Sequence, residues 1–425
     1  MRLYSTLSHR KEELPAPPGP VGMYVCGPTV YARAHVGNAR PFVLGMWLRS
    51  WLRSQGYDVT LVHNITDIND KIYEAAPGAS APLAERATRW YLEDTADLGL
   101  GMPDHVPKAS ELVPQIVAFI EQLVERGHAY AVEGDVYFRV ASYPDYGRLS
   151  GQRPDEVEEQ EPNPRKEDPR DFALWKANKP DEDTWWDSPW GRGRPGWHIE
   201  CSVMAEELLG PAFEIHGGGL DLVFPHHENE VAQSRALGRE FARIWAHNGI
   251  LRFTGEKMSK SLGNVTTLRE AIDEYGSETV LVFFLTGHWG KPIDFSEETV
   301  RAAQARAERF RDVLRAASEP APPDAWQRFA TALDDDFNTP QALAVMHEWR
   351  DHELLLRALD IFGLASLAAE EEAPEEIRAL AEQRAAARDR HDFSEADRLR
   401  EEIESRGWTV RDVAGDGGFQ LVPRA

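Results

Sequence analysis

The sequence of 425 residues contains little cysteine and no long apolar run. Only Cys26 and Cys201 occur, which excludes a disulfide-rich secreted scaffold. No apolar run reaches the roughly 18 residues of a membrane span, and the start Met-Arg-Leu-Tyr-Ser-Thr lacks the apolar core of a signal peptide. These absences predict a soluble, cytoplasmic protein without a membrane partner.

Positive charge is also scarce. The 71 acidic residues outnumber the 47 basic ones, and the formal net charge is −24. This excess of acid argues against a protein that binds nucleic acid non-specifically, although a local basic face could still recognise one RNA. The length allows two to four domains, each with its own core.

The stretch over residues 22–40 organises the rest of the chain. Its apolar run Met23–Cys26 suits a buried strand, Gly27-Pro28 breaks that strand, and a helical pattern follows from Pro41. A strand, a turn and the start of a helix offer backbone N–H groups to a phosphate. The run over 57–65 predicts a second strand, which completes a strand-helix-strand unit.

The remaining pattern predicts an α/β domain interrupted by an insertion and followed by helices. We expect helices over 83–99 and 111–126, β-like runs within 128–195, a strand over 196–201, a helix over 202–209, a strand over 213–216, and helices over 226–237, 299–317, 323–333, 339–362 and 374–407. No internal repeat is evident.

Two motifs predict a site for a nucleoside triphosphate. His35 and Asn38, three residues apart at a helix start, can face one ligand, and Gly37 lets a phosphate approach the backbone. About 220 residues later, Lys257-Met258-Ser259-Lys260-Ser261 would supply Lys257 and Lys260 from a mobile loop. Together they could stabilise the charge that develops when a carboxylate is adenylated. Taken alone, each motif is also compatible with an ordinary helix start or a solvated loop.

Glycines after the strand over 213–216 predict a nucleoside contact. In Gly217-Gly218-Gly219-Leu220-Asp221, Gly218 would let the nucleoside lie against the chain and Asp221 would accept hydrogen bonds from ribose hydroxyls. A tight turn is the alternative.

The two cysteines suggest a metal site. Each stands at the carboxyl end of a predicted strand, and His226 shares a helix face with Glu230 four residues later. Two thiolates, an imidazole and a carboxylate would form a four-coordinate zinc site. His227, three residues before Glu230, is a competing ligand that spacing does not exclude. Two buried cysteines beside a polar helix start remain the simpler alternative.

Four further residues are predicted to contact the substrate: Gly27, Thr66, Trp197 and His198. Trp197 could form an aromatic wall for a small thiol substrate, although tryptophan more commonly packs in a core. Thr66, with Asp67, stands at the carboxyl end of the second strand, where open parallel sheets bind ligands, but turn residues are equally frequent there.

The sequence resembles the cysteinyl-tRNA synthetases, a class I aminoacyl-tRNA synthetase family. The resemblance spans about residues 1–415 and rests on motifs in the family's order: Met23–Tyr31, Asn64–Ile72, Gly196–Ser202, His216–Gly219, Phe224–Glu230 and Lys257–Asn264. Two departures occur. Val36 stands where the family usually has Ile, a conservative change, and the chain ends soon after Trp408, which leaves the details of anticodon recognition open.

The resemblance implies one zinc ion per chain, held by Cys26, Cys201, His226 and Glu230, which selects His226 over His227. It also implies that Trp197 contacts the bound cysteine and that Lys260 contacts ATP, with Mg²⁺ accompanying the nucleotide. By the same resemblance the helical bundle contacts tRNA, and the C-terminal element reads the anticodon.

The expected fold is therefore a Rossmann-like class I synthetase catalytic domain with an inserted subdomain, an α-helical bundle and a small C-terminal element. The expected divisions are a catalytic first half over 1–127, an insertion over 128–195, a catalytic second half over 196–250, the lysine-motif and stem-contact region over 251–298, a tRNA-binding bundle over 299–368 and an anticodon element over 369–425.

The expected activity joins L-cysteine, ATP and tRNA(Cys) in a monomer, by way of cysteinyl-adenylate. Two rivals are a related ligase that passes cysteine to an amino sugar and a catalytically silent zinc-stabilised binding module. The element over 374–415 favours tRNA over the amino sugar, and the intact lysine motif argues against a silent module.

Overall fold

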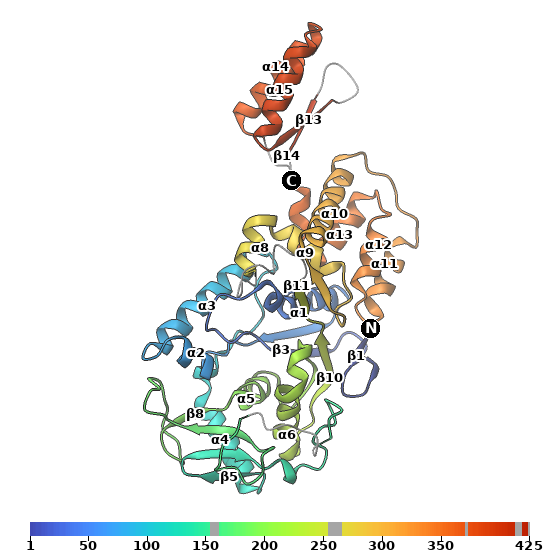
Figure 1. The fold of residues 1–425 in the computed structure, drawn as a ribbon. Helices are drawn as coiled ribbons and strands as arrows, with labels where there is room; N and C mark the ends of the chain where they lie inside the picture. Colours follow the sequence, from blue (N-terminus) through green and yellow to red (C-terminus); the bar gives the residue numbers. More distant parts are fainter. Residues whose placement is uncertain (154–160, 254–265, 370–372, 413–418, 424–425) are drawn as a thin grey trace.

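Four parallel strands form the sheet that positions the site. The computed structural model describes residues 1–153, 161–253, 266–369, 373–412 and 419–423. Within them, β10 (Phe241–Asn248), β9 (Ala212–Gly219), β3 (Pro20–Val25) and β4 (Asp58–His63) lie in that order, each parallel to its neighbours. The sheet crosses the middle of the molecule in Figure 1.

The strand order reverses between β3 and β9. Helix α1 (Ala39–Ser54) connects β3 to β4 on one side, and α6 (Glu228–Ala236) connects β9 to β10 on the other. A crevice therefore opens at the carboxyl ends of β3 and β9, where doubly wound sheets bind ligands. Trp47 and Trp51 of α1 are fully buried and anchor the helix to the core.

An antiparallel sheet follows β4 in the chain and precedes β9. It consists of β5 (Ala129–Val132), β6 (Asp135–Phe138), β7 (Phe172–Ala177) and β8 (Gly193–Pro195). The helices α2 (Asp70–Ala75), α3 (Ser80–Ala96) and α4 (Val113–Glu125) precede it. The sheet lies within residues 128–195, where the sequence predicts β-like runs, and Figure 1 shows it at one end of the molecule.

The predicted strand over 196–201 is wrong, because these residues begin a helix. Helix α5 spans Trp197–Leu209, so Cys201 lies one turn inside a helix and not at the end of a strand. The strand ends earlier, in β8, and a β-carbon on Gly196 would overlap the carbonyl oxygen of Ala173. Seven successive residues, 199–205, are buried, and a helix buried on all sides has no polar face for a sequence pattern to show.

Among the residues described after β11 (Leu251–Phe253), helices dominate, and only β12 (Ile293–Phe295) interrupts them before the C-terminal hairpin. They are α8 (Leu268–Tyr275), α9 (Ser277–Leu285), α10 (Glu297–Arg315), α11 (Ala325–Asp334), α12 (Thr339–Met346), α13 (His352–Ile361), α14 (Glu375–Asp389) and α15 (Phe393–Ser405). No helix in the described ranges is long and apolar enough to cross a membrane.

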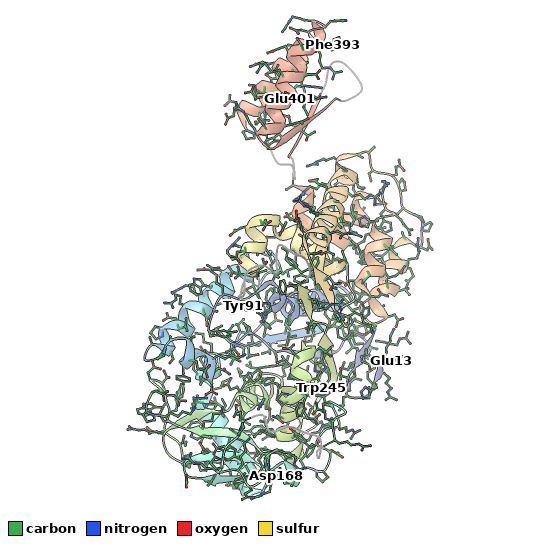
Figure 2. All side chains as sticks on the ribbon, viewed as in Figure 1. Glu13, Tyr91, Asp168, Trp245, Phe393 and Glu401 are labelled. Carbon is green, nitrogen blue, oxygen red and sulfur yellow. The ribbon has the colours of Figure 1, made fainter. Side chains whose placement is uncertain are left out.

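Two of the predicted helices are each divided in two. The range 339–362 contains α12 and α13, and the range 374–407 contains α14 and α15. The side chains of Asp351 and Asp392 accept from the backbone N–H groups of Leu354 and Glu395, so each Asp caps a new helix. The hairpin of β13 (Trp408–Asp412) and β14 (Phe419–Pro423) completes the C-terminal unit, which contains the labelled Phe393 and Glu401 in Figure 2.

Candidate active site

The predicted phosphate motif forms a short turn before α1. Val36–Asn38 is a 3₁₀ turn, and the Asn38 side-chain oxygen accepts from the His35 backbone N–H at 3.2 Å. A β-carbon on Gly37 would lie 3.0 Å from the His35 ring and 3.2 Å from Cβ of Leu251. Partial burial lowers the pKa of His35, so its imidazole is neutral at pH 7 and acts as a hydrogen-bond donor or acceptor, not as a fixed charge.

Lys257 and Lys260 lie outside the described residues. The residues on both sides of that stretch contact the His35–Asn38 turn. The His35 ring meets the Phe253 ring edge to face at 6.3 Å, and the Val36 N–H donates to the Thr266 carbonyl at 3.0 Å. The residues that flank the lysine motif, Phe253 and Thr266, thus contact the His35–Asn38 turn, although the two motifs are distant in sequence.

Gly27 and Thr66 connect the carboxyl ends of β3 and β4. The Gly27 N–H donates to the Asn64 side chain at 2.9 Å, and a β-carbon on Gly27 would overlap the Asn64 carbonyl oxygen. The Thr66 hydroxyl accepts from the Asn64 amide at 3.2 Å, and its backbone N–H donates to Pro28. Gly27 is therefore required by the backbone itself, and Asn64, which the sequence analysis did not single out, orders this loop.

Gly218 lies within β9, near its carboxyl end, whereas Asp221 follows the strand. A β-carbon on Gly218 would lie 2.9 Å from Cε1 of His227, so this glycine lets the strand pass the imidazole. Asp221 is exposed at the rim, and its negative charge raises the pKa of His35 against the larger effect of burial. The contact of either residue with a nucleotide remains a prediction.

Four buried side chains converge at the base of the crevice. Ligand atoms of Cys26, His226, His227 and Glu230 all lie within 4.8 Å of one another. Nε2 of His226 is 3.2 Å from Oε1 of Glu230, and Nε2 of His227 is 3.2 Å from Sγ of Cys26. The structure thus brings three of the four predicted ligands together and leaves both neighbouring histidines in place.

Cys201 approaches the same cluster from α5. Its sulfur lies 3.9 Å from that of Cys26. Two sulfurs bound at 2.3 Å to one tetrahedral zinc ion would be about 3.8 Å apart, so this separation suits a shared ion. Although the helix replaces the predicted strand, one turn of α5 still carries the thiol to the crevice.

Two histidines that the sequence analysis did not assign surround the cluster. Nε2 of His216 lies 3.6 Å from Sγ of Cys26, and Nε2 of His247 lies 2.7 Å from Nδ1 of His227. They belong to two strands, β9 and β10, and both reach the cluster because these strands are paired. No spacing rule within one element could have found them.

The histidines His216, His226 and His227 differ in what their Nδ1 atoms contact. A metal-bound histidine usually uses its other nitrogen in a hydrogen bond. Nδ1 of His226 lies 3.0 Å from Nδ1 of His198, and Nδ1 of His227 meets His247. Nδ1 of His216 is buried and has no hydrogen-bond partner among the described residues. The arrangement therefore favours His226 and His227 over His216 as ligands.

Burial makes the site suited to a cation. It raises the pKa of the Cys26 thiol and of the Glu230 carboxyl well above their usual values. A hydrogen bond from Cys26 lowers the pKa of Cys201. Both Glu230 oxygens are buried without a hydrogen-bond partner among the described residues. A buried carboxylate without donors requires a positive charge, so this cluster could hold a metal ion.

Trp197 and His198 lie beside the cluster, and their contact with a substrate remains a prediction. The Trp197 ring stacks on His226 with centroids 4.3 Å apart. Both residues line a cavity of about 180 Å³, together with Tyr146, Arg170 and Lys176, among others. A small ligand could enter there between the insertion and α5.

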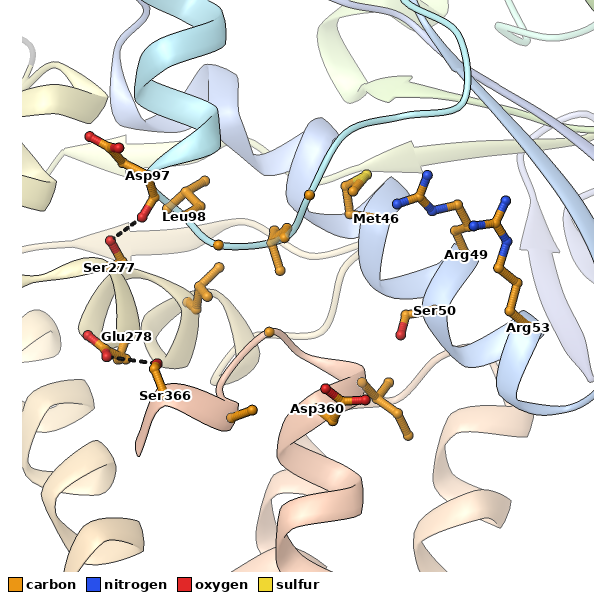
Figure 3. A pocket seen from close by; sticks show the side chains of 17 residues that line it. Met46, Arg49, Ser50, Arg53, Asp97, Leu98, Ser277, Glu278, Asp360 and Ser366 are labelled. Carbon is orange, nitrogen blue, oxygen red and sulfur yellow. Dashed lines mark hydrogen bonds between the residues drawn. The ribbon is translucent and has the colours of Figure 1, made fainter. Parts of the chain in front are cut away.

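A larger cavity, of about 670 Å³, lies away from this chemistry (Figure 3). It opens between the second half of α1, the loop over 97–101 and residues 360–366. Its arginines, Arg49 and Arg53, already pair with Asp104. None of the residues predicted for the active site lines this cavity. The volume of a cavity therefore does not identify the active site in this protein.

Solved structures and a protein-family model that resemble this chain agree with this geometry. The chain is similar in fold to solved structures of a Mycobacterium tuberculosis methionyl-tRNA synthetase with methionyl-adenylate (TM-score 0.58, 15% identity, 81% of this chain and 88% of that chain) and an Agrobacterium radiobacter leucyl-tRNA synthetase complex (TM-score 0.54, 12% identity, 83% of each). The family model "tRNA synthetases class I (C) catalytic domain" matches residues 13–305. The chain is therefore a class I aminoacyl-tRNA synthetase.

The particular family follows from closer relatives. The chain is 46% identical to the cysteine–tRNA ligase of Alkalilimnicola ehrlichii over 97% of this chain and 98% of that one, and 43% identical to that of Pseudomonas aeruginosa over 99% and 100%. A DALR domain matches residues 328–365, and a cysteinyl-tRNA ligase anticodon binding domain matches 370–420. The chain belongs to the cysteine–tRNA ligase family.

Proposed function

We propose that this chain activates L-cysteine with ATP and transfers it to the 3′ end of tRNA(Cys). A cysteine carboxylate oxygen attacks the α-phosphorus and pyrophosphate leaves. The 3′-terminal ribose hydroxyl then attacks the acyl carbon and AMP leaves. The observation that carries the proposal is the buried Cys26–His226–His227–Glu230 cluster at the carboxyl ends of β3 and β9.

In this proposal the triphosphate is bound and oriented by His35, Asn38, Lys257 and Lys260. Gly37 lies in the same turn as His35 and Asn38. Gly218 and Asp221 hold the nucleoside, and Mg²⁺ accompanies ATP. Positioning and electrostatic stabilisation suffice for the first step, and no covalent enzyme intermediate is required. The contacts of His35 and Val36 with Phe253 and Thr266 support a shared site for the two motifs.

The ligands that we propose for one zinc ion are Cys26, Cys201, His226 and Glu230. Two observations support this set: the 3.9 Å between the sulfurs, and the Glu230 oxygens, which have no hydrogen-bond partner among the described residues and lie near the His226 ring. Bound zinc would supply a soft Lewis acid that accepts the substrate thiolate and rejects the hydroxyl of serine. His227 then lies next to the ligand shell, with Nε2 directed at the Cys26 sulfur.

The substrate contacts that we propose are Gly27, Thr66, Trp197 and His198. Trp197 and His198 line the cavity of about 180 Å³ beside His226, which supports a place for the cysteine near the metal cluster. Gly27 and Thr66 act through the backbone of the β3 and β4 ends, which they keep close together.

The proposed acceptor is tRNA, and the proposed form is a cytoplasmic monomer. The anticodon-domain match over residues 370–420 favours tRNA over an amino sugar, because a ligase for a small acceptor has no use for an anticodon reader. The match of the DALR domain supports a helical region that contacts the same tRNA.

One experiment tests the activity. ATP–pyrophosphate exchange is measured with cysteine and with serine, and the adenylate is then offered to tRNA or to an amino-sugar acceptor. We expect cysteine-dependent exchange followed by charging of tRNA. Transfer to the amino sugar would move the chain to the rival ligase, and absence of exchange in zinc-loaded protein would overturn the enzymatic assignment.

A further inference from the structure

Arg40 is a buried cation without an acidic partner. Its residue is 1% exposed, and no carboxylate forms an ion pair with it in the described part of the chain. Burial lowers the pKa of Arg40 to about 10, so the guanidinium still carries its charge at pH 7. Buried arginines are rare unless paired, because removing the charge from water is unfavourable.

The position of Arg40 adds to this cost. It occupies the first turn of α1, two residues after Asn38, and that turn contains no acidic residue. The N-terminus of a helix is itself positive, so the dipole of α1 repels the guanidinium. A more ordinary arrangement would place an acid or a neutral residue there. The contacts that Arg40 makes must therefore offset the cost of burying its charge at this position.

Arg40 donates to two backbone carbonyls from distant parts of the chain. Nη1 donates to the Gly249 carbonyl, and Nη2 donates to the His288 carbonyl at 3.1 Å. The Gly249 N–H in turn donates to the Trp289 carbonyl at 2.8 Å. A β-carbon on Gly249 would overlap the backbone of Lys291, so the close approach of these two segments requires glycine.

Gly249 begins the path into the lysine motif. It follows β10 directly, and β11 starts two residues later and ends at Phe253. Leu251 of that strand packs on Gly37, with 3.2 Å between its Cβ and a β-carbon built on the glycine. The Ile250 carbonyl accepts from Ile293 at 3.2 Å. Arg40 thus ties the first turn of α1 to the strand that packs against the His35–Asn38 turn.

We propose that Arg40 is a positioning residue for adenylate formation. It fixes Gly249, and with it the β11 strand, at a set distance from His35 and Asn38. The inference rests on the proposed function, because it requires these groups to act on one nucleotide. Arg40 itself touches no reacting atom.

The test compares Arg40→Gln and Arg40→Lys with a matched control, Arg49→Gln. Arg49 lies on the same helix and also donates to a backbone carbonyl, that of Met102 at 2.7 Å, far from the motif. A misplacement of about 1 Å can cost 100-fold in rate, so we expect kcat for pyrophosphate exchange to fall 10- to 100-fold in Arg40→Gln. The KM for cysteine and the bound zinc should stay unchanged, and Arg49→Gln should match the wild type.

Two further readouts separate positioning from folding. Arg40→Lys keeps the charge but can reach only one carbonyl, so its kcat should lie between those of the wild type and Arg40→Gln. Millimolar guanidinium should restore part of the kcat of Arg40→Ala and leave Arg49→Ala unaffected. A lower Tm for Arg40→Gln with unchanged kcat, or loss of zinc together with activity, would overturn the inference.

The inference and the proposed function fail separately. No cysteine-dependent exchange in the wild type overturns the proposed function and the inference that rests on it. An active wild type with an equally active Arg40→Gln overturns the inference alone.

Discussion

Nδ1 of His227 lies 2.7 Å from Nε2 of His247, whose own Nδ1 lies 2.7 Å from the Thr6 hydroxyl. This chain of contacts runs from the N-terminal segment through β10 to the Cys26–His226–His227–Glu230 cluster and holds the His227 ring in one orientation. His226, by contrast, is oriented by His198 and Trp197. The rings of His226 and His227 are therefore oriented by different residues. Replacing one of these side chains should leave the other in place.

Substitution of His226 and of His227 should give different results. If His226 is the ligand, His226→Gln loses zinc and raises the KM for cysteine at least 10-fold. His227→Gln should retain zinc but bind it more weakly, by about 10- to 100-fold, as expected for a residue next to the ligand shell. Zinc content and competition with a chelator measure both effects. Loss of zinc in His227→Gln alone would reverse the assignment.

Cys201→Ser tests the ligand that lies outside the tight four-residue group. A hydroxyl is a much poorer zinc ligand than a thiolate, so we expect loss of metal and a sharp rise in the KM for cysteine. Met204→Leu, buried on the same helix, is the control for packing and should keep both values. A Cys201→Ser protein with normal zinc and normal activity would remove Cys201 from the site.

Much of the crevice could be predicted because its signals are local. The apolar run before Gly27 and the helical pattern after Pro41 specify β3 and α1, and the adjacent residues carry the phosphate motif. Other features depend on tertiary contacts. Burial on all sides hides the helical period at the start of α5, before the predicted helix over 202–209, and His216 and His247 reach the cluster from two paired strands. Arg40 gives no sequence signal because its partners are backbone carbonyls.

Lys260→Ala should mainly lower kcat for adenylate formation. The lysine would stabilise charge that moves onto the departing pyrophosphate, an interaction stronger in the transition state than in the bound substrates. We expect the KM for cysteine and the zinc content to stay the same. Lys11→Ala, which removes a surface ion pair with Asp335, is the control. Normal pyrophosphate exchange by Lys260→Ala would contradict the role of the motif.

His63 should make stability depend on pH. It is buried between the Val25 carbonyl and the Tyr91 hydroxyl, and burial lowers the pKa of His63 to about 4. In the unfolded chain the His63 imidazole has a pKa of about 6.5, so it binds a proton that the buried ring of the native state does not bind. The stabilisation is therefore complete above pH 6.5 and is lost as the pH falls towards 4.

The comparison of wild type with His63→Gln isolates this effect from the other buried histidines. Between pH 7.5 and pH 5 the wild type should lose about 2 kcal/mol more unfolding free energy than the variant. Urea titrations followed by tryptophan fluorescence measure the difference. Equal losses in the two proteins would show that His63 is not the group that titrates.

Arg309 should contribute to tRNA binding without affecting adenylate formation. Burial of the His347 ring, followed by the charges of Arg309, Arg306 and Arg350, lowers the pKa of His347 to about 4. Arg309 is exposed on α10, so this part of the helical bundle presents positive charge in a chain whose net charge is −24. Phosphate contacts of this kind strengthen binding without reading bases.

Arg309→Ala should raise the KM for tRNA several-fold and reduce its salt dependence by about one phosphate contact. Pyrophosphate exchange, which needs no tRNA, should be unchanged. Arg328→Ala is the matched control, because Arg328 on α11 is already paired with Glu348 at 2.7 Å and should have little charge to offer a phosphate. Equal effects of the two substitutions would show that the tRNA does not approach this face, and the bundle would then act only as a support for the catalytic sheet.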